Sequence, residues 1–127
     1  MSSHRVSHHP AAVSRARAAL VSELNRSDAV TPECRDSAAL VLTELLGNAI
    51  EHADPLEDGR VLVSWRVRDG RVHISVTGAR GPGEPRVLDA PVIAPSGRGL
   101  LIVQALVERW WRDVHGQAST VHAVLSC

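Results

Sequence analysis

The sequence predicts an α+β fold: a two-layer sandwich with helices on one face of a mixed, mostly antiparallel sheet. Two observations favour it. Apolar residues repeat with helical spacing in three segments, and they alternate in two pairs of short segments that turn signals join. The order along the chain is helix, helix, hairpin, long loop, helix, hairpin.

The length suits one domain. With 127 residues, of which 44% are hydrophobic, two separate cores would have about 60 residues each, which is marginal. We expect residues 1–10 to be a flexible tail and residues 11–127 to form a single domain.

Composition excludes several functions. The chain has no Lys, a formal net charge of +0 and a pI near 7.1, so nothing indicates direct binding to nucleic acid or an anionic membrane. No apolar run reaches the 18 residues of a membrane span, and the first residues lack a secretion signal. We therefore expect a cytoplasmic protein. Cys34 and Cys127 could form one disulfide, but two reduced thiols are favoured in that compartment.

Two helices are predicted in the first half of the chain. The first covers 11–26. The second runs to about Ala53, where an Asp-Pro pair stops it. Thr31 can cap its start, Pro32 fits the first helical position, and Glu33 favours the positive end of the dipole.

Two hairpins and a third helix complete the elements. The segments 60–68 and 71–77 alternate around Asp69-Gly70, and a last hairpin turns at Gly116-Gln117. A third helix is predicted from Gly99 to about Arg109. Before it, residues 78–98 are rich in Gly and Pro without any period, and so long a loop in a small domain is usually functional.

Glu44, Asn48 and His52 are four residues apart on the second helix, so they lie on one stripe. A solvated helix face would explain such a stripe, but its neighbours are strongly apolar and an Asn in mid-helix runs against propensity. A carboxylate one turn from an amide oxygen suits a general base beside a ligand of a hard cation. The segment Ser96-Gly97-Arg98-Gly99-Leu100 opens the third helix, where free N–H groups can bind an anion.

Together these segments resemble the GHKL ATPase and kinase superfamily, which has the Bergerat ATP-binding fold, and in particular its anti-sigma-factor serine kinases. The resemblance covers residues 11–125. Residues 44–53, Glu-Leu-Leu-Gly-Asn-Ala-Ile-Glu-His-Ala, match the N box, and residues 96–103 match the second glycine box. Glu108-Arg109-Trp110 also fits.

The resemblance implies a role for each matching residue. Glu44 would be the catalytic base, Asn48 would hold Mg²⁺, residues 79–98 would form a lid over ATP, and Thr120 would lie near the adenine edge. The positions expected to bind the nucleotide are Asn48, His52, Gly78, Gly81, Gly83, Gly97, Arg98, Gly99, Leu100 and Thr120.

One position departs from the family pattern. The family has an Asp after the second strand of the first hairpin, which accepts a hydrogen bond from the adenine amino group, and Gly78 stands there in this chain. Losing a hydrogen bond to a charged group would weaken ATP binding by roughly 10- to 100-fold.

Two functions follow from the resemblance, and a third has a separate basis. The first is a protein serine/threonine kinase that would act on an anti-sigma antagonist, bind a sigma factor and form a homodimer. The second is a non-catalytic protein-binding module whose nucleotide binding is weak or lost, which Gly78 favours. The third is a metal site formed by His4, His8 and His9, although three His residues in a tail usually have no such role.

Overall fold

The computed structural model describes residues 2–80 and 98–127, without the side chains of 98–100. The elements in chain order are β1 (Ser2–Ser7), α1 (Ala11–Leu24), α2 (Pro32–His52), β2 (Arg60–Arg68), β3 (Arg71–Ala79), α3 (Arg98–Leu106), β4 (Arg109–His115) and β5 (Ala118–Ser126). They form one sheet in the order β1-β2-β3-β5-β4. Every neighbouring pair of these strands is antiparallel, so the expected mixed sheet is corrected to an antiparallel one.

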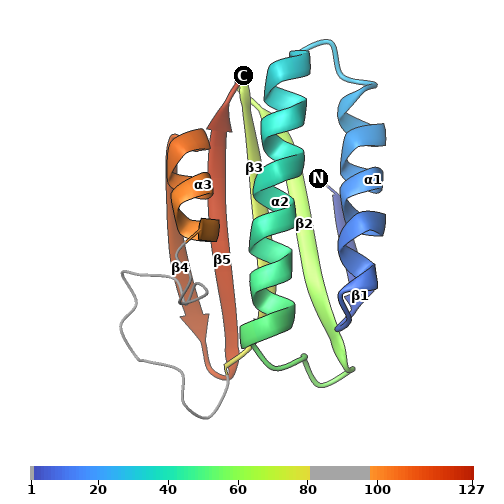
Figure 1. Ribbon diagram of the computed structural model, residues 1–127, viewed down its shortest axis with the longest axis vertical. Helices are drawn as coiled ribbons and strands as arrows, with labels where there is room; N and C mark the ends of the chain where they lie inside the picture. Colours follow the sequence, from blue (N-terminus) through green and yellow to red (C-terminus); the bar gives the residue numbers. More distant parts are fainter. Residues whose placement is uncertain (1, 81–97) are drawn as a thin grey trace.

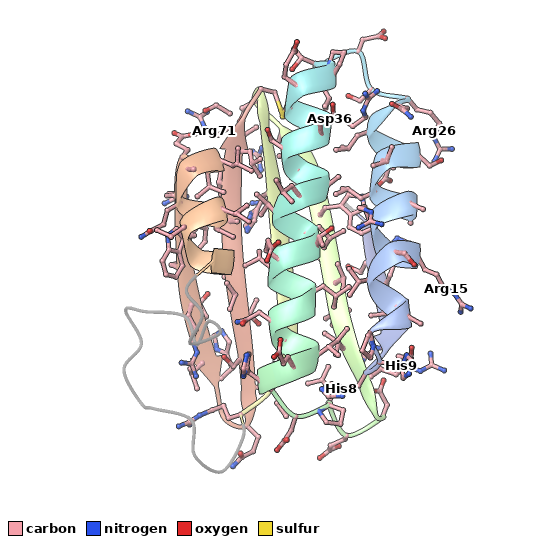
Figure 2. The ribbon with its side chains drawn as sticks, in the orientation of Figure 1. His8, His9, Arg15, Arg26, Asp36 and Arg71 are labelled. Atoms are coloured by element: carbon pink, nitrogen blue, oxygen red, sulfur yellow. A yellow bond between two sulfur atoms is a disulfide. The ribbon has the colours of Figure 1, made fainter. Side chains whose placement is uncertain are left out.

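The molecule has two layers, as the sequence predicts. The three helices lie on one face of the sheet, and none of the described helices lies on the other face (Figure 1). Arg15 projects from α1, and Arg26 from the segment directly after it, outward from the rest of the molecule (Figure 2). No helix in the described part of the chain has the length and apolarity needed to cross a membrane.

The core lies between the helices and the sheet. In each strand alternate residues face the helices, because side chains change sides at every residue. The fully buried side chains that meet there include Leu20, Leu24, Leu42, Leu46, Val61, Val63, Val72, Ile74 and Leu125.

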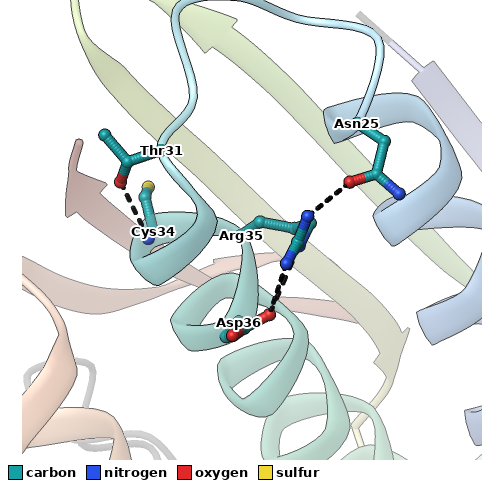
Figure 3. Close-up of polar contacts among 5 residues, drawn as sticks. All are labelled: Asn25, Thr31, Cys34, Arg35 and Asp36. Atoms are coloured by element: carbon teal, nitrogen blue, oxygen red, sulfur yellow. Dashed lines mark hydrogen bonds and ion pairs between the residues drawn. The ribbon is translucent and has the colours of Figure 1, made fainter.

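The predicted start of α2 is confirmed. The Thr31 hydroxyl accepts a hydrogen bond from the backbone N–H of Cys34 at 3.1 Å (Figure 3). In the next position Arg35 donates to Asn25 Oδ1 at 2.7 Å and to Asp36. The Thr31 cap supplies an acceptor for one of the backbone N–H groups that have no hydrogen-bond partner within the helix. Arg35 links the start of α2 to the segment that ends α1.

The turn predicted between β2 and β3 is also confirmed. Asp69 and Gly70 have φ angles of 53° and 71°. Left-handed backbone at both central residues matches the twist of a two-residue hairpin, which explains the Asp-Gly pair.

The prediction of a flexible tail at residues 1–10 is wrong, because residues 2–7 form the edge strand β1 and pair with β2. The side chain of Glu23 in α1 accepts hydrogen bonds from Ser2 and from the indole of Trp65. The ring of His4 stacks on Trp65, with centroids 4.7 Å apart. These contacts come from residues far along the chain, so the local sequence does not reveal the strand.

The expectation of two reduced thiols is also corrected. Cys34 and Cys127 form a disulfide that joins the first turn of α2 to the C-terminal residue, which follows β5. The two residues come within reach because the last strand ends beside the start of α2 (Figure 1).

Candidate functional site

A pocket opens between the second half of α2 and the sheet. Its volume is about 450 Å³, including the solvent at its mouth. The residues that line it are Leu45, Asn48, Ala49 and His52 of α2, Ala53 directly after it, Val76 and Gly78 of β3, Arg112 of β4, and Ser119 and Val121 of β5.

Regular periodicity explains why these residues meet. On α2 the lining residues are spaced by one, three or four positions, so they share one helix face. On the sheet side the register places Gly78 opposite Ser119, and Val76 opposite Val121. These pairs belong to the set of strand residues that face the helices.

Three of the predicted site residues come together in this pocket. Asn48 and His52 line it from the helix, and Gly78 lines it from the sheet. Glu44 lies one turn before Asn48 and is half-buried, outside the lining of the pocket. The predicted stripe on α2 therefore borders the pocket.

Thr120 is not brought to the pocket. It pairs with Thr77 across the strands, and their hydroxyl groups are 2.7 Å apart on the face of the sheet that points away from the helices. Ser119, one residue earlier, lines the pocket in its place. The sequence contains a signal for this difference. Ser119 is two and four positions from the apolar residues Val121 and Ala123, so it shares their face of the strand, whereas Thr120 does not.

Arg112 is the second residue that sequence analysis missed. Its exposed fraction is only 3%, although it carries a charge. Its Nε donates a hydrogen bond to the Ser119 hydroxyl at 2.8 Å. Burial lowers the pKa of Arg112, and the nearby positive charge of Arg80 lowers it further. The sequence alone contains no pattern that distinguishes this inward-facing arginine from an arginine on the surface.

Gly78 lies against the segment that leaves α2. A Cβ atom there would be 3.2 Å from the Asp54 carbonyl oxygen and 3.3 Å from the Ala53 Cβ. Asp54 and Ala79 also exchange two backbone hydrogen bonds, of 3.2 and 2.9 Å, beside this contact. Gly78 thus allows two backbone segments to approach closely at the end of the pocket.

With this geometry in place, comparison with known proteins decides the family. Residues 6–124 match the histidine kinase-like ATPase domain family. The chain belongs to this family. The fold also resembles the solved catalytic domain of the histidine kinase ThkA in a nucleotide-free form, with a TM-score of 0.56 and 18% identity over 99% of this chain and 97% of that one. A comparison with curated proteins finds no match.

Membership of this ATPase domain family confirms the resemblance to the GHKL superfamily, whose Bergerat fold the sheet and helices reproduce. It also supports ATP binding as the general role of the domain. The closer resemblance to anti-sigma-factor kinases stays a prediction.

Part of the predicted nucleotide site falls outside the described residues. Gly81, Gly83 and Gly97 are not described, nor is most of the expected lid. Arg98, Gly99 and Leu100 form the start of α3, but their side chains are not described. Their predicted contacts with phosphate stay predictions.

The described residues do not support a metal site at the N-terminal histidines. His4 packs on Trp65, and His8 donates from Nε2 to the Ala53 carbonyl oxygen at 2.8 Å. Within residues 2–80 and 98–127, no three His, Cys, Asp or Glu side chains are grouped to hold a metal ion.

Proposed function

We propose that this chain is an ATP-binding regulatory protein that acts with Mg²⁺ as a serine/threonine kinase on an anti-sigma antagonist. One observation carries the proposal: in a member of the histidine kinase-like ATPase family, α2 places Asn48 and His52 in a pocket against the sheet. Glu44 stands one turn before Asn48 on the same helix.

The residues present fit a nucleotide with its metal ion. Leu45, Ala49, Val76 and Val121 give the pocket apolar walls of the kind that accept a planar base. Asn48 supplies an amide oxygen, a ligand type that Mg²⁺ accepts alongside phosphate oxygens. A bound Mg²⁺ would neutralise charge that develops on the phosphates.

Glu44 supplies the acid–base chemistry in this proposal. Its carboxylate takes the proton from a serine hydroxyl of the antagonist while the serine oxygen bonds to the γ-phosphorus. The bond from that phosphorus to the bridging oxygen breaks, and ADP leaves. Because a base acts mainly in the transition state, Glu44 governs the rate of transfer more than the affinity for ATP.

The proposed partners are proteins. The antagonist is the substrate, a sigma factor is the regulated partner, and a homodimer is the proposed assembly. The proposed site of action is the cytoplasm, without direct contact to nucleic acid.

A second function has an observation in its favour. Gly78 provides no acceptor for an adenine amino group, and a side chain there would begin only 3.2 Å from the Asp54 carbonyl oxygen and 3.3 Å from the Ala53 Cβ. This favours a protein-binding module whose affinity for ATP is weak or lost.

Calorimetric titration of the full chain with ATP, with and without Mg²⁺, tests the proposal. We expect one ATP per chain and tighter binding when Mg²⁺ is present. Transfer of the γ-phosphate to an antagonist should disappear in Glu44→Gln, with ATP affinity unchanged. A complete lack of nucleotide binding would favour the protein-binding module.

A further inference from the structure

The face of the sheet that points away from the helices, which we call the open face, is hollowed near the turn between β2 and β3. None of the described helices covers this face (Figure 1). The hollow has a volume of about 600 Å³ with the solvent at its mouth, and its lining includes Arg66, Arg68, Asp69, Arg71, His73 and Arg109. Another molecule can therefore reach these side chains without a change in the described elements.

The strand register explains why these arginines meet. Arg66 and Arg68 are two positions apart on β2, so both face the open side and lie about 7 Å apart along the strand. In the pairing of β2 with β3, Arg66 lies opposite His73, and Arg68 lies opposite Arg71. Arg109 of β4 pairs with the β5 residue that faces His73. Arginines from three strands thus share one patch.

The carboxylates beside this hollow neutralise two of its arginines. Glu108 accepts hydrogen bonds from Arg71, at 2.8 Å from Nε and 3.3 Å from Nη2. Asp69 lies 3.6 Å from the Nε of Arg68. Four guanidinium groups against two carboxylates leave an excess of two positive charges.

The other two arginines carry this excess. Within the part of the chain that the structure describes, Arg66 and Arg109 form no ion pair with a carboxylate, and both are exposed. Arg109 lies over the ring of Trp111 at 4.7 Å, a cation–π contact that does not neutralise its charge. Burial lowers the pKa of His73, which stands between them, and nearby positive charges, those of Arg66 and Arg109 included, lower it further. This patch therefore has a positive potential.

The hollow continues along the strands. A second hollow, of about 630 Å³ with the solvent at its mouth, shares Arg66 and His73 with the first, and its lining also includes Ser64, Ser75 and His122. Ser64 and Ser75 are register partners, two positions from Arg66 and His73. The two hollows form a groove parallel to β2 and β3, with arginines at one end and hydroxyl groups at the other. This elongated shape suits an extended segment better than a small anion.

An extended acidic peptide matches the groove in spacing as well as in charge. Alternate side chains of an extended chain point the same way about 7 Å apart, which is the separation of Arg66 and Arg68 along β2. Guanidinium groups bind carboxylates in a bidentate manner. We propose that this groove docks a partner protein through an extended segment with acidic residues at alternate positions. The groove lies on the face opposite the pocket, so the proposal does not depend on nucleotide binding.

Two other occupants fit the groove less well. Nucleic acid would need more than two excess charges, and the chain has a formal net charge of +0. The ring of Trp111 already stacks on His122 and contacts Arg109, so it is not free to stack on a base. A second copy of the chain lacks the acidic segment in its described strands, in which Asp113 is the one acidic residue.

The first test compares two peptides on the unmodified full chain. Capped Ser-Ser-Glu-Ser-Glu-Ser-Ser places both carboxylates on one side of an extended chain, whereas capped Ser-Ser-Glu-Glu-Ser-Ser-Ser has the same composition and places them on opposite sides. In NMR titrations at low ionic strength, the alternating peptide should bind about 5-fold more tightly, the effect of one well-formed exposed ion pair. The amide signals that shift should belong to β2 and β3.

Three outcomes would overturn the proposal. Equal affinities for the two peptides would mean a general attraction of charge without a docking register. Shifts confined to α2 and the pocket would place the peptide elsewhere. Tighter binding of a short oligothymidine, with the same shifts in β2 and β3, would assign the groove to nucleic acid. None of these results depends on whether ATP binds, so failure here is distinct from failure of the proposed function.

A variant then assigns the docking to Arg66. Arg66→Gln should weaken the alternating peptide by about 5-fold and remove its advantage over the adjacent one. Arg15→Gln is the matched control, because it makes the same change of charge at an exposed position in the helix layer (Figure 2). It should leave both affinities unchanged, and an equal loss in this control would overturn the proposal.

Sedimentation of the same variants tests a second copy as the occupant. A dimer that Arg66→Gln dissociates, with the affinity for the alternating peptide unchanged, would assign the groove to a second copy and overturn the proposal. If Arg66→Gln does not fold, the comparison of the two peptides on the unmodified chain still decides.

Discussion

The disulfide between Cys34 and Cys127 closes a loop of more than ninety residues, because the two positions are 93 apart in the sequence. It connects Cys34, the buried residue of the first turn of α2, to the exposed C-terminal residue. A cross-link over so long a loop restricts the unfolded chain, which stabilises the folded state by about 4 kcal/mol on entropic grounds.

Reduction should therefore destabilise the protein strongly. We expect the free energy of unfolding to fall by about 3–4 kcal/mol in dithiothreitol, measured from urea denaturation followed by circular dichroism. The variant Cys127→Ser should show the same loss without reductant and no further change with it. An unchanged urea midpoint on reduction would contradict this account of the disulfide.

Gly78 and Gly47 should respond in opposite ways to substitution by alanine. At position 78 the new Cβ would press on the Asp54 carbonyl oxygen and the Ala53 Cβ, so Gly78→Ala should cost about 1–3 kcal/mol of stability. Gly47 lies inside α2 with nothing within 4 Å of its Cβ position, so Gly47→Ala should gain about 0.5–1 kcal/mol. Urea denaturation measures both changes.

The same contact limits what a carboxylate at position 78 could restore. Gly78→Asp would place an acceptor near the pocket only if the segment of Ala53 and Asp54 moved by a few tenths of an ångström. We expect it to lower stability and to raise ATP affinity by less than about 10-fold, short of the full effect of a charged hydrogen bond. A larger gain in ATP affinity, in a variant that is stably folded, would show that the segment of Ala53 and Asp54 moves easily.

The sequence predicted the elements whose signals are local. The Thr31 cap and the Asp69-Gly70 turn each depend on residues next to one another, and both are confirmed. Strand β1 could not be predicted, because it has one apolar residue facing the helix layer, Val6, and is held by residues far along the chain. The burial of Arg112 depends likewise on the register of β4 with β5, which local sequence does not determine.

Stability should fall as the pH drops through the titration of two histidines on the open face of the sheet. His73 Nε2 and His122 Nδ1 are 3.0 Å apart, and His122 Nε2 lies 3.0 Å from Asp113 Oδ2. If His122 donates to Asp113 from Nε2, its Nδ1 accepts from His73, and this chain of bonds needs neutral rings. A proton on His122 Nδ1 would break the bond to His73.

The pKa values follow this geometry. Burial lowers the pKa of His73 below its ordinary 6.5, as do the charges of His122, Arg66 and Arg109. Burial also lowers the pKa of His122, and the carboxylate of Asp113 opposes this only in part. The folded state thus binds fewer protons than the unfolded state just below pH 6.5, so the stability contributed by the pair is present above 6.5 and is lost as the pH falls toward the folded-state values.

Urea midpoints measured between pH 7.5 and about 5 should therefore decrease, and His73→Asn should flatten the decrease. Glu23 and Glu108, whose pKa values are also lowered, act in the same direction only below their ordinary 4.5, outside this range. His9→Asn, at an exposed position, is the control and should leave the slope as in the unmodified protein. A flat profile for the unmodified protein would mean that the pair is not held in neutral form.

Neighbouring residues on β5 provide the sharpest test of which face binds the nucleotide. Ser119 lies in the pocket and accepts from Arg112 Nε, whereas Thr120 bonds to Thr77 on the opposite face. Ser119→Ala removes a hydroxyl group from the lining of the pocket and the acceptor for Arg112 Nε, so nucleotide affinity should fall by about 5- to 10-fold, less than the loss of a direct hydrogen bond between the protein and a charged ligand group. Thr120→Val keeps the shape of the side chain and should leave affinity unchanged, although it breaks the bond to Thr77. Both affinities can be measured by the same calorimetric titration. If Thr120→Val weakened binding and Ser119→Ala did not, the nucleotide would lie on the open face of the sheet, and the pocket against α2 would not be its site.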